Sequence, residues 1–135
     1  MGKIQLWKDR EKGVIDPQLF SSKAEELAQQ LADDHKKSKG QRANKRTQLR
    51  KFYDEVLRLE SEARSREGEW DRIAPLVHML TAKAAYAKGR ELVSKTFLDF
   101  IKDSVSQVKE QKDLAVFANF FEAVMGFYRQ HGPSN

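Results

Sequence analysis

The chain has 135 residues, a formal net charge of +5 and no cysteine. Its length suits one domain around a single hydrophobic core, and the lack of cysteine excludes disulfides, iron–sulfur clusters and Cys-ligated zinc. The three histidines do not share a helical turn, so we expect no metal site and no cofactor. No apolar run is long enough to cross a bilayer and no secretory signal is recognisable, so we expect a cytoplasmic protein without membrane contact.

The positive charge is concentrated in one block. Residues 36–51 carry eight basic and no acidic side chains, whereas residues 1–35 have a net charge of −2 and residues 52–135 a net charge of −1. A compact basic block is typical of proteins that bind a polyanion, most often a nucleic acid. We favour such a site over a solvated basic linker of the same composition.

A first helix is expected directly after an N-terminal segment. Residues 1–21 show little periodicity but hold several apolar side chains, so this segment should be docked or partly flexible. Ser22 and Glu25 have the spacing of a capping box. This spacing predicts a helix that begins there and ends near His35.

The basic residues 36–44 have no apolar periodicity. Gly40 and the repulsion among like charges favour a mobile loop, and Asn44 is a candidate N-cap for a second helix over residues 45–66. The apolar stripe of that helix is formed by Leu49, Phe52, Tyr53, Val56, Leu59 and Ala63. Ion pairs four residues apart are expected on its exposed face, namely Arg50–Asp54, Lys51–Glu55 and Asp54–Arg58.

A third helix is predicted to begin near Asp71, as its N-cap, or nearer Ile73, and to end at Gly89, with Pro75 in its first turn. Its expected stripe consists of Ile73, Leu76, Val77, Leu80, Ala84 and Ala87. Fourth and fifth helices are predicted over residues 90–107 and 112–131. The stripe of the fifth is wide, which indicates either a central position or a second contact face. Its members are Leu114, Phe117, Phe120, Phe121, Val124, Phe127 and Tyr128.

No segment has the period-2 pattern of a strand, so the expected fold class is all-α. We predict a compact bundle of about five helices in a single domain spanning residues 1–135. Catalytic motifs are also missing from the sequence: there is no Gly-rich phosphate loop and no nucleophile elbow, and the carboxylates lie scattered beside cations. His78 is interpreted as a residue at the core boundary. We therefore expect that the protein is not an enzyme.

Cations flank two of the predicted apolar stripes. At about 100° per residue, Arg46 and Arg50 occupy adjacent turns of the second helix, beside its stripe. Lys83, Tyr86 and Arg90 share one face of the third helix. A row of cation, aromatic ring and cation suits a nucleic-acid strand, because it offers phosphate contacts and a platform for a base. Periodicity alone favours a plainer interpretation, a tyrosine at the core edge with solvated cations around it.

Several segments occur in a distinctive order: residues 15–20, 24–28, 45–56, 83–90 and 120–128. The run Gln-Leu-Arg-Lys-Phe-Tyr within residues 45–56 is more specific than the sequence of an ordinary bundle helix. Together, over most of the chain, these segments resemble the helical small subunit of the type III-A CRISPR effector, the Csm complex.

The resemblance implies a non-catalytic subunit that stacks in several copies along the guide RNA–target RNA duplex. Its implied partners are the target RNA, the backbone and large subunits of the complex, and further copies of itself in a filament, with a dimer as an alternative for the isolated chain. Phosphate contacts are assigned to Lys45, Arg46, Arg50, Lys83 and Arg90, with Lys51 and Lys88 as further members, and Tyr86 either stacks on a base or packs.

Two other functions are considered. The first is a helical protein–protein adapter whose basic loop binds an acidic partner without touching RNA. The second is a helix-turn-helix protein that binds DNA. The turn at residues 67–69 is acidic, which argues against a recognition helix there.

Overall fold

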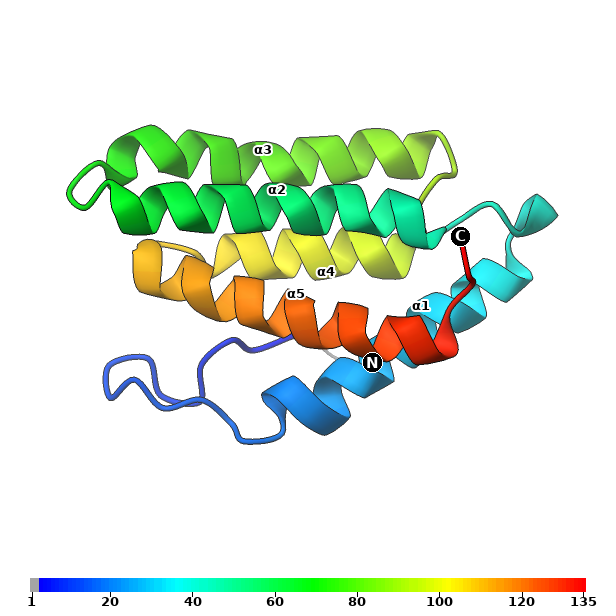
Figure 1. Ribbon diagram of the computed structural model, residues 1–135, viewed down its shortest axis with the longest axis horizontal. Helices are drawn as coiled ribbons and strands as arrows, with labels where there is room; N and C mark the ends of the chain where they lie inside the picture. Colours follow the sequence, from blue (N-terminus) through cyan, green and yellow to red (C-terminus); the bar gives the residue numbers. More distant parts are fainter. Residues whose placement is uncertain (1–2) are drawn as a thin grey trace.

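Residues 3–135 are described by a computed structural model, and they form five α-helices (Figure 1). The helices are α1 (Ala24–Lys37), α2 (Arg46–Ser65), α3 (Trp70–Gly89), α4 (Lys95–Ser106) and α5 (Gln111–His131). A π-helical turn, Leu19–Lys23, leads into α1, and a 3₁₀ turn, Lys39–Gln41, follows it. Extended pairing within residues 3–135 is limited to one isolated bridge between Asp9 and Val14, so the predicted all-α fold class is confirmed.

Helix α5 has a central position in the bundle. Helices α2, α3, α4 and α5 run along the long axis, and α5 packs against both α2 and α1 (Figure 1). Of the two explanations for its wide apolar stripe, the central position therefore holds. The stripe residues that are fully covered are Leu114, Phe117, Phe120, Phe121, Val124 and Tyr128.

Aromatic rings fill the space between α4 and α5. Phe100 on α4 lies at the middle of this cluster, and Phe52 joins α2 to it through Phe97, at 5.1 Å between ring centroids. Edge-to-face contacts of this kind add to the stabilisation that burial itself provides. The rings whose centroids lie between 5.1 and 5.9 Å from that of Phe100 are those of Phe97, Phe117, Phe120 and Phe121.

The starts of α1 and α3 differ from their predictions. Ser22 does not cap α1, because it lies inside the π-helical turn and its hydroxyl donates to Gln18 Oε1 at 3.3 Å. Helix α3 begins at Trp70, so Asp71 falls in its first turn instead of capping it. Pro75 lies beyond that first turn, inside the helix.

Helix α4 begins at Lys95, five residues later than predicted. Ser94 sets this start, since its hydroxyl oxygen accepts from the Phe97 amide at 3.5 Å. Residues 90–94 form the turn between α3 and α4 instead of the first residues of α4. Leu76 on α3 is also wrongly predicted as core, because it is 41% exposed.

The ion pairs on α2 follow a different pattern from the predicted one. Arg58 Nε lies 2.8 Å from Glu55 Oε1, and Arg58 Nη1 lies 3.2 Å from Glu62 Oε2. None of the three predicted pairs is formed among residues 3–135. Arg58 pairs with one glutamate a turn before it and one a turn after it, and Asp54 is left exposed to solvent.

Hydrogen bonds restrain the basic segment 36–44. Helix α1 continues to Lys37, so the loop itself is shorter than predicted. His35 Nδ1 donates to the Ala43 carbonyl at 2.8 Å, and Ser38 Oγ accepts from the Ala43 amide at 3.2 Å. The loop end is therefore fastened to the end of α1.

Asn44 does not cap α2, contrary to the prediction; Lys45 stands at that position. Asn44 is fully buried, with a φ of 59° that asparagine adopts more readily than most residues. Its Nδ2 donates to the Leu31 carbonyl at 3.1 Å, and its Oδ1 accepts from the Ser94 amide at 2.9 Å. Its own amide donates to the Leu92 carbonyl at 3.0 Å, so it joins α1 to the α3–α4 turn.

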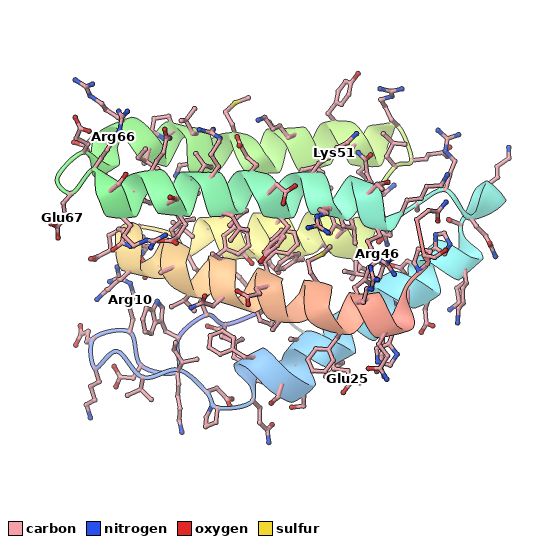
Figure 2. The ribbon with its side chains drawn as sticks, viewed as in Figure 1. Arg10, Glu25, Arg46, Lys51, Arg66 and Glu67 are labelled. Atoms are coloured by element: carbon pink, nitrogen blue, oxygen red, sulfur yellow. The ribbon has the colours of Figure 1, made fainter. Side chains whose placement is uncertain are left out.

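The N-terminal segment packs on the bundle through Leu6, which is fully buried. Trp7 Nε1 donates to Asp113 Oδ1 at 2.8 Å. Arg10, which lies between the N-terminal segment and α5 in Figure 2, donates through its Nε to the same oxygen at 2.9 Å. Asp113 lies in the first turn of α5, and its Oδ2 also accepts from the Lys109 amide at 2.9 Å. Burial raises the pKa of Asp113, but these hydrogen bonds outweigh it and hold the pKa below its usual 3.8.

Substituting Asp113→Asn should lower the free energy of unfolding at neutral pH by about 1–3 kcal/mol. A depressed folded pKa stabilises the fold above the unfolded value and loses this effect as the pH falls through the folded value. The difference between wild type and variant should therefore shrink below pH 3.8. Urea unfolding across pH measures it, with Asp33→Asn, an exposed position, as the control. Equal stability of wild type and variant at neutral pH would contradict this role.

Candidate nucleic-acid interface

Four of the predicted site residues line one groove between α2 and α3. Lys51 comes from α2, Lys83 and Tyr86 come from α3, and Arg90 lies just after its end. The groove has a volume of about 470 Å³. Its other lining residues are Gln48, Phe52, Glu55, Leu80, Ala87 and Leu92.

The floor of this α2–α3 groove is apolar and its rim is charged. Leu80 and Ala87 are buried and Phe52 is 7% exposed, whereas Lys51 and Lys83 are exposed. The helical repeat explains the division, because residues next to the core stripe of α3 point along its flank. Figure 2 shows Lys51 extending from α2 on the side that faces α3.

Tyr86 is 68% exposed, which a tyrosine packed at the core edge would not be. The guanidinium carbon of Arg90 lies 5.8 Å from the centroid of its ring. Cation–π attraction at this distance keeps the cation beside the ring. The row of cation, aromatic ring and cation recognised in the sequence is thus present on the surface of α3.

Glu55 is the acidic residue of the groove, and no sequence pattern indicated its place there. Its carboxylate lies 3.5 Å from Lys83 Nζ and accepts from Arg58 Nε at 2.8 Å. The hydrogen bond from Arg58 is the main cause that lowers the pKa of Glu55, so the carboxylate is ionised at neutral pH. Lys51 and Arg90 form no ion pair with any residue in the range 3–135. Three cations and one carboxylate leave the groove positive.

Arg46 lies away from the groove, beside the C-terminal end of α5 (Figure 2). Its Nη1 donates to the Ser134 carbonyl at 3.2 Å, and its Nη2 donates to the Arg129 carbonyl at 3.5 Å. Its Nε is buried without a hydrogen-bond partner. The guanidinium therefore holds the C-terminal residues against the start of α2. No local pattern signals this contact, because the acceptors are backbone carbonyls more than 80 residues away.

The remaining predicted residues are dispersed. Lys45 is exposed immediately before α2, and Arg50 is exposed on its second turn, outside the groove lining. The pair that we predicted between Arg50 and Asp54 is not formed in the part of the chain that the structure describes. Lys88 lines a different hollow on the far side of the α3–α4 turn. The structure thus brings together half of the predicted set.

Other kinds of site are not found in the described part of the chain. No group of three His, Asp or Glu side chains within residues 3–135 is placed to hold a metal ion. The described helices include none with the length and hydrophobicity of a membrane span. His78 is exposed on α3 instead of lying at the core boundary.

Comparison with known proteins gives one family match. The model of the family described as Csm2 Type III-A matches residues 16–134, a range that contains all five helices and the whole α2–α3 groove. No curated protein and no solved structure matches the chain.

Arg46→Ala should loosen the C-terminal residues, because the two carbonyls that it binds lose their donor. We expect faster amide hydrogen exchange over residues 129–135, with little change at the α2–α3 groove. Lys45→Ala, which removes an exposed neighbouring cation, should leave that exchange unchanged. Equal exchange in both variants and wild type would show that Arg46 does not hold the C-terminal segment.

Proposed function

Because this chain belongs to the Csm2 Type III-A family, that of the small subunit of the type III-A CRISPR complex, we propose that it contacts target RNA through the α2–α3 groove. The observation that carries this proposal is the convergence of Lys51, Lys83 and Arg90 around the exposed ring of Tyr86. These residues come from two helices, so neither helix alone would form the site.

The chemistry of the groove suits a phosphodiester backbone. Lys and Arg side chains neutralise phosphates without reading sequence, and Arg adds a planar fork that binds two phosphate oxygens. Lys51 and Arg90 are free of internal ion pairs within residues 3–135, so binding need not break one. Tyr86 offers an open ring face for a base or ribose.

Sequence-independent contact is what a small subunit of such a complex requires. In an RNA-guided complex, base pairing between guide and target reads the sequence. The subunit then only has to hold the target strand. We infer a non-catalytic, cytoplasmic role in which several copies stack along the guide–target duplex, next to the backbone and large subunits. Each copy binds weakly, and repetition raises the effective concentration of the next contact.

The test is the salt dependence of target-RNA binding by the assembled complex. Replacing Lys51, Lys83 and Arg90 by glutamine should weaken binding and flatten the plot of log affinity against log salt. Each lost phosphate contact lowers the slope by about 0.7–0.9. The matched control replaces Lys12, Lys102 and Arg72, which are exposed and unpaired within residues 3–135.

The two sets remove the same charge, so a non-specific field would affect both equally. We expect the control complex to keep the wild-type slope. A groove variant with the wild-type slope would contradict RNA contact at this site. That outcome would favour the alternative function, a helical protein–protein adapter without RNA contact.

A further inference from the structure

A second hollow, of about 390 Å³, lies at the basic loop. It is an open hollow lined by the end of α1, the loop, the α3–α4 turn and the start of α4. We call it the loop hollow. Its charged lining residues are Lys37, Lys39, Arg42, Lys88 and Lys95, with Asp34 and Glu91.

Five cations and two carboxylates give the loop hollow a net charge of +3. Part of this charge is already used: Lys95 Nζ lies 2.8 Å from Asp99 Oδ2, outside the hollow. Lys37, Lys39 and Lys88 form no ion pair with any residue in the range 3–135. An excess of unpaired cations around a concave surface favours an anionic ligand.

The backbone beneath these cations is held in place. Ala43, between Arg42 and the buried Asn44, is fixed by hydrogen bonds at both its amide and its carbonyl. Gly40 has a φ of 65°, which glycine adopts without steric cost, so the chain can turn there between α1 and α2. A ligand therefore meets a preformed loop, and little conformational entropy is lost on binding.

The loop hollow and the α2–α3 groove meet at the α3–α4 turn. Leu92 lines the groove, and Val93, the next residue, lines the hollow. Arg42 Nη2 donates to the Arg90 carbonyl at 3.3 Å, which ties the loop to the residue that borders the groove. Cations thus continue from Lys83 and Arg90 in the groove to those of the loop, and Glu91 is the one carboxylate of the α3–α4 turn along this path.

We propose that the loop hollow is a second phosphate-binding site, which holds a further stretch of the RNA strand that leaves the α2–α3 groove. This inference rests on the proposed function, since it takes the strand from that groove. The continuity of the two cation clusters favours nucleic acid over an acidic peptide. Each subunit then binds the strand on both sides of the α3–α4 turn. The basic block of residues 36–51 is thereby part of the RNA site.

The test is an NMR titration of the full-length, ¹⁵N-labelled chain with a uridine oligonucleotide of about 16 nucleotides. NMR detects the weak binding expected of a single subunit. The amides of Ala43 and Thr96 report on the loop hollow, and those of Tyr86 and Ala87 report on the groove. In the wild type we expect both pairs to shift with one affinity.

The variant replaces Lys37, Lys39 and Lys88 by glutamine; none of the three side chains has an internal partner within residues 3–135, so the fold should persist. It should lose the shifts at Ala43 and Thr96, keep those at the groove, and lower the salt slope by about 0.7 per lost contact. The control replaces Lys8, Lys12 and Lys102, which are exposed lysines on other surfaces, and should match the wild type.

Chemical-shift changes at the groove amides without changes at the amides of the loop hollow would overturn this inference and leave the proposed function standing. Absence of both would overturn both. A polyglutamate peptide that shifts Ala43 and Thr96 where RNA does not would overturn it in favour of an acidic protein segment. A variant with wild-type shifts and slope would exclude these lysines as the phosphate contacts.

Discussion

The hydrogen bonds of the buried Asn44 join four parts of the chain, and the positions of the cations in the α2–α3 groove and in the loop hollow depend on these bonds. Its side chain binds the Leu31 carbonyl in α1 and the Ser94 amide at the start of α4. Its carbonyl accepts from the hydroxyl of Tyr128 in α5. Burial raises the pKa of Tyr128, so this phenol remains a donor throughout the physiological range. A buried amide without these partners would cost about 1–3 kcal/mol for each unpaired group, so the arrangement is strongly specified.

The position of α2 follows from this anchor. Because α2 starts two residues after Asn44, its register relative to the α3–α4 turn is set where Asn44 bonds to Leu92 and Ser94. That register places Lys51 on the side of α2 that faces the cations of α3. The same bonds hold the basic loop against the turn. One buried polar network therefore positions the α2–α3 groove and the loop hollow together.

Apolar periodicity predicted the helices and most of the core, since burial of a stripe is a local pattern repeated over several turns. Local patterns did not predict the role of polar side chains whose hydrogen-bond partners lie far away in the sequence. Asparagine is a residue type that often caps helices, but Asn44 is buried and hydrogen-bonds to α1 and to the start of α4. Arg46 binds backbone carbonyls near the C-terminus. The exposure of Tyr86 could not be predicted either, because it depends on where α2 lies. The sequence pattern therefore indicates the cations but not which of them converge in the groove.

Photo-crosslinking of the assembled complex is the sharpest test of RNA contact at the α2–α3 groove, because it reports contact instead of charge. A target RNA that carries 4-thiouridine at successive positions would be bound, irradiated and digested, and the adducts located by mass spectrometry. We expect adducts on the peptide that contains Tyr86, the exposed ring of the α2–α3 groove. Adducts confined to other surfaces of this subunit, with none on α2 or α3, would contradict it.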